Sequence, residues 1–259
     1  MTLTSAPKFS RLAALTLLCI GLLPISLSAQ RDRSLEAYML AVSIKGDASI
    51  GRVSGVPVDV VFGTFLESLE IGGMIHYEGF QQDGPWGFMG DYSFMDLGFK
   101  GGNSRGGIID AGLRQGIFEA MVAYRQEMAD DATIDWFVGV RWWDFDVDLL
   151  LDPAITPGNR QISVTEDWVD TIVGGRARIP MSDSWTFVGR LDLGGLTGAD
   201  FTFLGSVGFE YRLAPKWVLD VQYKALWVDY DNDGPTGQVG DFTYDTVSHG
   251  PLIGIVYEF

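Results

Sequence analysis

The last segment of the chain, residues 243–259, alternates between two kinds of residue. Reading back from the end, every second position is Phe259, Tyr257, Ile255, Ile253 and Pro251. The positions between them carry small or apolar residues and one charge. Because successive side chains of a β-strand point to opposite faces, this segment is predicted to be a strand with one apolar, aromatic-ended face. A chain that ends in such a strand is constrained to build a sheet.

The same alternation recurs along the chain and predicts ten strands. They are expected at 35–44, 69–79, 86–97, 107–125, 134–143, 168–179, 185–194, 201–213, 217–229 and 243–259. In the ninth, the apolar face runs from Trp217 to Trp227, and the opposite face carries Asp220, Gln222 and Lys224. Aromatic residues at both ends of an apolar face are typical of strands that cross a membrane, since these side chains favour the two lipid–water boundaries.

Two further features favour a closed barrel. Beyond the first 29 residues no run of 18 apolar residues occurs, so no transmembrane helix is expected. A closed barrel pairs every backbone N–H and C=O between strands, which a lipid environment requires. The predicted fold is therefore an all-β, transmembrane, antiparallel up-and-down barrel of ten strands, with eight or twelve strands as the alternatives.

The connections between these strands alternate in length, as short periplasmic turns and longer outer loops would. Long outer loops are expected at 46–68, 151–165 and 231–242. In the first, apolar residues between Val58 and Leu69 recur at helical spacing, which predicts a short helix. The alternative is an extended stretch, because Val56, Val58, Val60 and Phe62 also alternate; that alternative would give an odd number of strands.

The N-terminus has the features of a secretory signal. Lys8 and Arg11 precede an apolar stretch at 12–22, and small residues precede a cleavage site after Ala29. We therefore expect a signal peptide at 1–29 and a barrel domain at 30–259. The one cysteine, Cys19, lies in the signal, so the mature chain is expected to lack thiols. The formal net charge of -16 predicts repulsion of nucleic acid.

Charged residues gather on the face predicted to line the lumen. They are Glu70, Glu78, Asp91, Glu119, Arg125, Asp135, Arg141, Asp170, Arg176, Arg178, Arg190, Asp192, Glu210, Arg212, Asp220, Lys224 and Glu258. The interior of a ten-stranded barrel is only slightly wider than the one that side chains fill at about eight strands. We expect a packed network of ion pairs, with a charged, ion-selective pore as the alternative. In 107–125, Arg114 and Glu119 are an odd number of residues apart, so on a regular strand they would point to opposite faces. If both face the lumen, a β-bulge is predicted between them.

The candidates for catalysis and metal binding are few. His76 shares its face with Glu78, whereas Ser248 and His249 are adjacent and point to opposite faces. A hydrogen-bonded barrel histidine is expected, and an outer-membrane hydrolase is the alternative. The acidic spacing that opens a calcium loop is present at Asp229, Asp231 and Asp233, but Gly240 stands at the twelfth position, so an acidic turn is favoured over a metal site. A second acidic row comprises Asp144, Asp146, Asp148 and Asp152, where cations could bridge to lipopolysaccharide phosphates.

Several stretches resemble those of opacity-type outer-membrane β-barrels, a bacterial family with many uncharacterised members. They are DWVD at 167–170, VGGRAR at 173–178, RLDLGG at 190–195, GFEYR at 208–212 and GPLIG at 250–254. The stretch 59–69 is similar to the first loop of that family. The resemblance covers most of the mature chain and is strongest over 165–259. It implies a barrel in the cell outer membrane and little about activity.

The expected function is that of a non-enzymatic outer-membrane barrel with a structural or surface-contact role and no cofactor. A small channel for ions or solutes is the first alternative, and an outer-membrane hydrolase is the second. The expected partners are outer-membrane lipid, lipopolysaccharide and the barrel-assembly machinery. The resemblance implies that this machinery reads a terminal aromatic signal, here Phe259, Tyr257 and Ile255.

Overall fold

The computed structural model describes residues 31–51, 53–100, 108–151, 161–234, 238 and 240–259. The predicted signal peptide at 1–29 and Asp152 lie outside these residues. Within them, no helix is long and apolar enough to span a bilayer. The strands are β1 (Arg31–Leu40), β2 (Ser43–Ile50), β3 (Val53–Val60), β4 (Leu69–Gln81), β5 (Trp86–Lys100), β6 (Ile108–Glu127), β7 (Thr133–Leu151), β8 (Gln161–Pro180), β9 (Trp185–Gly195), β10 (Phe201–Ala214), β11 (Trp217–Asp231) and β12 (Phe242–Glu258). An α-helix, α2 (Phe62–Ser68), follows β3, and a short 3-10 helix, η2 (Ala129–Asp131), follows β6.

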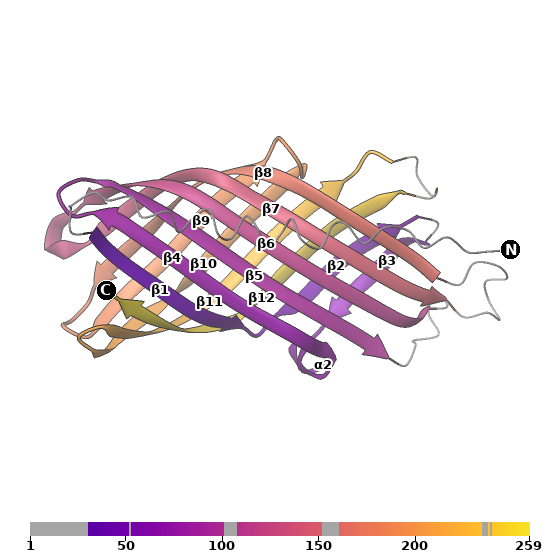
Figure 1. Ribbon diagram of the computed structural model, residues 1–259, viewed down its shortest axis with the longest axis horizontal. Helices are drawn as coiled ribbons and strands as arrows, with labels where there is room; N and C mark the ends of the chain where they lie inside the picture. Colours follow the sequence, from indigo (N-terminus) through magenta and orange to yellow (C-terminus); the bar gives the residue numbers. More distant parts are fainter. Residues whose placement is uncertain (1–30, 52, 101–107, 152–160, 235–237, 239) are drawn as a thin grey trace, which may run out of the picture. The chain divides into compact units, whose positions relative to one another are not determined.

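The described strands β1 and β4 to β12 form a closed antiparallel ring of ten (Figure 1). Each pairs with the next along the chain, and β1 closes the ring by pairing with β12 from Ser34 opposite Glu258 to Leu40 opposite Leu252. The predicted all-β barrel and its ten strands are therefore confirmed.

The first two strands of the ring are interrupted, and here the sequence prediction was wrong. β2 continues along β12 beyond β1, and β3 pairs with β2, so β2 and β3 prolong β1 and β4 instead of forming a loop at 46–68. The helix is present, but it begins at Phe62 and sits within the second strand of the ring (Figure 1). The extended alternative holds as far as Val60. It adds no strand to the ring, because β3 prolongs β4.

Glycines allow the interrupted first strand to lie close to β12. The backbone N–H of Ala41, between β1 and β2, donates to the carbonyl of Pro251 at 2.8 Å. A Cβ at Gly250 would stand only 1.9 Å from the Ala41 carbonyl oxygen. A larger residue at 250 would therefore push the chain away from β12 at the point where it passes from β1 to β2.

The exterior of the barrel carries an apolar band bounded by aromatic residues. On β11, Trp217 pairs with Tyr257 at one end, with ring centroids 4.8 Å apart, and Trp227 pairs with Phe201 at the other, at 5.2 Å. Between them the outward-facing Val221 is 43% exposed. Ten residues of strand tilted by about 40° span about 25 Å along the membrane normal, the height of a transmembrane barrel's apolar band. The exterior is therefore that of a β-barrel that spans a membrane.

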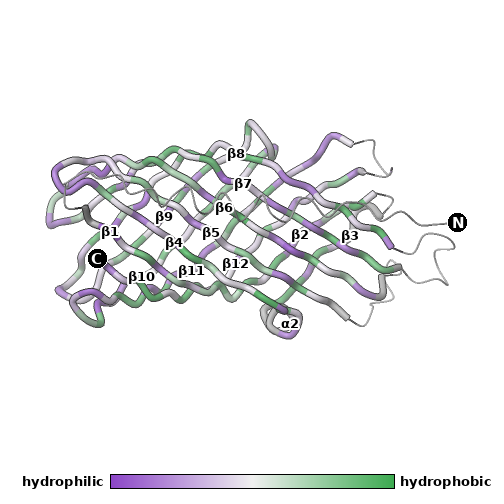
Figure 2. Tube along the Cα trace, in the orientation of Figure 1, coloured by the Kyte–Doolittle hydropathy of each residue, from purple (hydrophilic) through white to green (hydrophobic). Residues whose placement is uncertain are grey.

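Beyond this band the polarity of the two faces of the sheet is reversed. On β7, Val138 and Val140 face outward and are 54% and 40% exposed, and Asp144 and Asp148 continue the same exposed face. The inward positions between and beyond them are apolar: Trp143, Phe145 and Leu149 are all buried. Figure 2 shows how hydrophilic and hydrophobic residues alternate along the strands. Apolar residues inside and acids outside suit a sheet surrounded by water, so the outer ends of the strands extend above the membrane.

This reversal accounts for two further differences from the sequence prediction. β6 pairs with β5 and β7 without a register shift from Asp110 to Tyr124, so the expected bulge between Arg114 and Glu119 is absent. Arg114 faces outward, in the extension, where it contacts Asp96 and Asp146 at 3.6 Å each. β7 and β8 also reach to 151 and back from 161, so the loop expected at 151–165 is shorter. The connection expected at 231–242 is confirmed, since β11 ends at Asp231 and β12 begins at Phe242.

Candidate functional site

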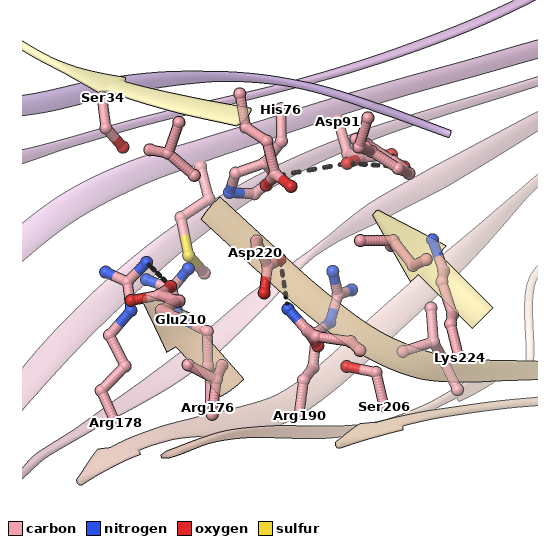
Figure 3. Close-up of a pocket in the computed structure, with 18 of the residues that line it drawn as sticks. Ser34, His76, Asp91, Arg176, Arg178, Arg190, Ser206, Glu210, Asp220 and Lys224 are labelled. Carbon is pink, nitrogen blue, oxygen red and sulfur yellow. Dashed lines mark hydrogen bonds and ion pairs between the residues drawn. The ribbon is translucent and has the colours of Figure 1, made fainter. Parts of the chain in front are cut away.

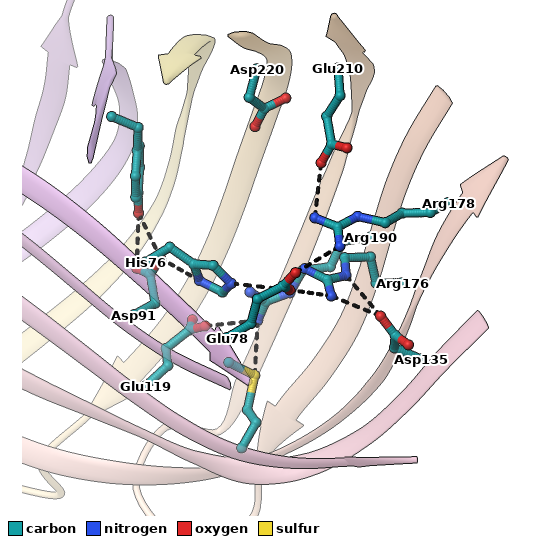
Figure 4. A network of polar contacts seen from close by, with 12 residues as sticks. His76, Glu78, Asp91, Glu119, Asp135, Arg176, Arg178, Arg190, Glu210 and Asp220 are labelled. Atoms are coloured by element: carbon teal, nitrogen blue, oxygen red, sulfur yellow. Dashed lines mark hydrogen bonds and ion pairs between the residues drawn. The ribbon is translucent and has the colours of Figure 1, made fainter. Parts of the chain in front are cut away.

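Two arginines on β8 join carboxylates from three other strands across the lumen (Figure 4). Arg178 donates from Nη1 to Glu78 Oε1 at 2.7 Å and from Nη2 to Glu210 Oε1 at 2.9 Å. Arg176 donates from Nη2 to Asp135 Oδ2 at 2.7 Å and also contacts Glu78. Both arginines point inward because they are two residues apart on one strand. The planar guanidinium forks therefore link β4, β7 and β10 through the barrel interior.

A second cluster lies next to the first and is more deeply buried. Arg141 donates from Nε to Glu119 Oε1 at 2.7 Å and from Nη2 to Asp192 Oδ1 at 2.8 Å. Arg190 donates from Nη2 to Glu119 Oε2 at 2.8 Å and from Nε to Asp192 Oδ2 at 2.9 Å. The side chain of Arg141 is 0% exposed. Two arginines and two carboxylates thus neutralise one another in the middle of the lumen.

A third group is centred on Asp91. The Tyr38 hydroxyl donates to Asp91 Oδ1 at 2.8 Å, and His76 Nδ1 lies 3.2 Å from Asp91 Oδ2. His76 Nε2 lies 3.9 Å from Glu78, which joins this group to the Arg176 and Arg178 cluster. Both flanking acids can hold a protonated imidazole in place.

The predicted lumen charges fall into four sets. Those that the structure brings together in interior ion pairs or charged hydrogen bonds are Glu78, Asp91, Glu119, Arg125, Asp135, Arg141, Arg176, Arg178, Arg190, Asp192 and Glu210. Asp170, Asp220 and Lys224 also face inward but have other neighbours. Arg212 and Glu258 pair with each other on an exposed part of the barrel, 2.8 Å apart. Glu70 is exposed and was wrongly placed in the lumen, because the register of β4 shifts between Leu69 and Ile71.

Two inward-facing residues were missed because the first strand was interpreted as apolar on both faces. Tyr38 and Glu36 face the lumen, while Leu35 and Met39 face outward at 40% and 68% exposure. The Glu36 carboxyl lies over Gly254, where an added Cβ would stand 1.9 Å from its Oε1. It thereby reaches Asp220, which receives a hydrogen bond from Gln222 at 2.6 Å. The sequence signal that could have placed Glu36 in the lumen was its alternation with Leu35 and Met39 along the strand.

A small cavity separates these groups (Figure 3). Its volume is about 70 Å³, and His76, Asp220, Gln222 and Lys224 are among the residues that line it. At about 15 Å³ per water this volume holds about five waters. The Lys224 ammonium lies 5.6 Å from the centre of the Tyr38 ring, within cation–π range. The cavity is large enough for a few waters.

Aromatic side chains fill the lumen next to the charged clusters, toward the outer end. The Trp168 ring stacks on Tyr230 at 3.8 Å and on Trp143 at 5.3 Å, and Phe145 stacks on Trp168 at 5.4 Å. Asp170 receives the indole N–H of Trp143 at 2.9 Å and the backbone N–H of Ala199 at 2.7 Å. Asp170 therefore anchors the stack instead of joining an arginine. We call Trp143, Phe145, Trp168 and Tyr230 the aromatic plug. The sequence places these residues on the inward face, but it does not show that they stack on one another, because they come from different strands.

The histidines do not assemble a nucleophile. Among the described residues, no serine hydroxyl lies within hydrogen-bonding distance of His76. His249 faces outward and shares a 2.6 Å hydrogen bond between its Nδ1 and the Tyr223 hydroxyl. Ser248 points to the opposite face, as its adjacent position requires.

The acidic residues weighed as metal ligands lie in a turn and on the adjoining strand. Asp231 Oδ1 accepts the backbone N–H of Asp233 at 2.8 Å, which makes a local turn. Asp229 lies on β11 opposite Asp245. Within the part of the chain that the structure describes, no group of three or more acidic, histidine or cysteine side chains has the arrangement of a metal site. In the second row, Asp146 and Asp148 accept hydrogen bonds from the hydroxyls of Thr165 and Ser163.

The terminal residues lie on the lipid-facing side. Ile255 and Phe259 are 39% and 51% exposed, and the Tyr257 ring stacks with Phe259 at 6.0 Å. The backbone N–H of Phe259 donates to the carbonyl of Arg33 at 3.0 Å, so the end of the chain is held against β1.

The chain was compared with known proteins. No protein-family model matches it, and no curated protein sequence matches it. Among solved structures it is similar to the outer membrane protease OmpT from Escherichia coli, with a TM-score of 0.49, 10% identity, and coverage of 91% of this chain and 99% of that one. It is also similar to a major outer membrane protein from Thermus thermophilus, with a TM-score of 0.44, 14% identity, and coverage of 88% and 99%. A third similar structure is Ail, the attachment invasion locus protein of Yersinia pestis, with a TM-score of 0.38, 11% identity, and coverage of 90% and 100%.

Proposed function

We propose that the protein is a non-enzymatic, non-conducting outer-membrane barrel that serves envelope structure or contact at the cell surface. The observation that carries the proposal is the closure of the lumen by two successive layers. The first is the buried cluster of Arg141, Arg190, Glu119 and Asp192. The second is the aromatic plug, in which Trp143 and Phe145 are each 1% exposed.

The electrostatics of the first layer support a structural role. Each carboxylate in it receives hydrogen bonds from two arginines, and each arginine contacts two carboxylates. An ion passing through would have to displace groups that already neutralise one another, and breaking a buried pair from one side costs about 3–5 kcal/mol. A selective pore instead presents charges that face free water.

The extension above the membrane supports surface contact. Its exterior carries Asp144, Asp148, Asp167 and Asp245, all exposed. These acids lie just outside the apolar band, at the level of the polar part of the outer leaflet. Lipopolysaccharide phosphates are therefore expected to approach them only through bridging divalent cations.

Membership of the opacity-type family is part of this proposal. The stretches that carry the resemblance include VGGRAR at 173–178 on β8 and RLDLGG at 190–195 on β9. They contribute Arg176, Arg178 and Arg190 to the lumen clusters. The resemblance is therefore concentrated in residues that hold the interior together.

Single-channel recording tests the proposal. The mature protein is refolded, shown to be folded by its different migration on gels before and after boiling, and inserted into a planar bilayer. We expect no conductance steps. Steady, uniform steps would show that the lumen conducts and would favour the channel alternative.

A further inference from the structure

The barrel holds an apolar pocket that the proposed function does not use. It has a volume of about 230 Å³ and lies between the β2–β3 hairpin on one side and β6 and β7 on the other. Ala48 and Val58 line the first wall, Leu113 and Val147 line the second, and Phe242 closes one side. An apolar cavity of about 150 Å³ in another protein stays dry and binds benzene, so this pocket is large enough for a segment of hydrocarbon.

The backbone hydrogen bonding of the barrel wall is interrupted beside this pocket, where the side chains of Val58 and Val60 pack against the cluster that contains Leu97. Within the described part of the chain, β3 has one hydrogen-bonded neighbour, β2, and stands at the end of the strand order. The pairing of β5 with β4 ends at Leu97, and beyond it β5 pairs with β6 alone. No described backbone ladder therefore joins β3 to the outer end of β5. The helix α2 occupies the corner where the second strand of the ring is broken (Figure 1).

This break lies at the edge of the lipid-facing surface. Val61, at the start of α2, is 50% exposed, and Ile71, just after it on β4, is 61% exposed. The outward face of β3 carries the exposed Asp59, paired with Lys45 on β2. The break therefore has an apolar exterior on its α2 and β4 side and polar groups on its β3 side.

We propose that this pocket binds a single hydrocarbon chain. Two observations select this ligand. The lining is apolar apart from Asp59 and the Tyr244 hydroxyl, so polar solutes have few partners. An unfilled apolar cavity destabilises a protein in proportion to its volume, so a chain that fills it gains binding energy. The chain belongs either to a membrane lipid or to a free fatty acid.

Photolabelling tests the proposal and separates the two sources. The protein in lipid nanodiscs is irradiated in one arm with a palmitic acid analogue that carries a diazirine in its chain. In the other arm the nanodisc contains a phospholipid with the same diazirine chain. Labelled positions are identified by mass spectrometry. We expect label at the pocket positions Leu113 and Val147, besides the lipid-facing Val138 and Val173. Pocket label from either probe supports the proposal and names the source.

Matched variants on β6 give the control. Ala111→Trp places an indole in the pocket and should lower pocket label about tenfold relative to label at Val138, which corresponds to about 1.4 kcal/mol. Ala120→Trp puts the same side chain on the lipid-facing side of β6 and should change neither label. If Ala111→Trp does not fold, as judged by gel migration, Ala48→Trp fills the pocket from the opposite wall. Label confined to lipid-facing positions in both arms, or pocket label that persists in a folded filled variant, would overturn the proposal.

Discussion

Arg141 and Glu119 stand directly opposite each other on β7 and β6, and their side chains meet at 2.7 Å with almost no exposure to solvent. A directly opposed pair of opposite charge is the contact that a sheet aligns best. Because Arg141 also reaches Asp192 on β9, one side chain ties three strands together across the lumen. This arrangement sets the first prediction.

Replacing Arg141 with leucine should destabilise the barrel by about 3–5 kcal/mol, because Glu119 and Asp192 would each lose a partner while remaining buried. The free energy of unfolding of the refolded protein in urea measures the change. Arg212→Leu is the matched control. It breaks the exposed pair with Glu258, which is worth about 0–1 kcal/mol. Equal losses for the two variants would show that the interior cluster is not what stabilises the barrel.

The orientation of β11 predicts different costs at neighbouring positions. Val221 faces lipid, so Val221→Arg should cost about 2–4 kcal/mol of folding stability in liposomes. Gln222 faces the cavity beside Asp220, where an arginine finds a carboxylate, so Gln222→Arg should cost much less. Unfolding in urea from the same liposomes compares them. The reverse order would mean that the strand is inside out.

The reversal of polarity along β7 predicts a contrast between two outward positions. Val138→Arg puts a charge in the apolar band and should cost about 2–4 kcal/mol. Asp144→Arg lies in the extension, opposite Asp167 on β8, and should be neutral or stabilising. The same stability assay in lipid measures both. A large loss at Asp144 would place that position within hydrocarbon and contradict the extension.

The aromatic plug should contribute much of the stability of the outer end. Trp168→Ala removes the 3.8 Å stack on Tyr230 and leaves a buried void, at a cost of about 3–5 kcal/mol. Trp185→Ala removes an indole that is 48% exposed on the exterior, and its effect on unfolding should be much smaller. If Trp168→Ala unfolds at the same urea concentration as the unmodified protein, the plug is not packed as the rings indicate.

Deletion of Phe259 should lower the amount of barrel assembled in cells, as the resemblance to opacity-type barrels implies. Its side chain is half exposed and its backbone N–H makes a single bond to Arg33, so stability of the refolded protein in detergent should change little. Heat-modifiable protein in outer-membrane fractions measures assembly, and urea unfolding measures stability. Normal assembly of the truncated chain would remove the terminal-signal hypothesis.

The alternation of side chains was enough to predict the ring of ten strands, since period two follows directly from strand geometry. It was also enough to place Arg141, Glu119, Arg176 and Arg178 inside. Which partner each charge takes depends on strand register. The contacts between Arg178 on β8 and Glu210 on β10 could therefore not be derived from the sequence alone.

Two of the errors have one physical origin. Sequence patterns were interpreted as if lipid surrounded the whole length of every strand. Arg114 then appeared to require a bulge, and the acids at 144–148 appeared to mark the approach to a loop. Both are explained once the surroundings change from lipid to water along a continuous strand. For Trp143 and Trp168, the parity was visible, but their packing against Tyr230 joins strands far apart in the sequence.

The unbroken ladder between β7 and β8 has a mechanical consequence. The pairing continues without a shift from Thr133 opposite Arg178 to Leu150 opposite Gln161, through the level where the exterior turns acidic. There is no hinge between these strands at the bilayer surface, so their outer ends cannot bend independently of the membrane anchor. Seven residues beyond Asp144 rise about 18 Å along the membrane normal at a tilt of about 40°. A partner that binds the outer ends of these two strands would therefore be held at a fixed distance from the bilayer surface.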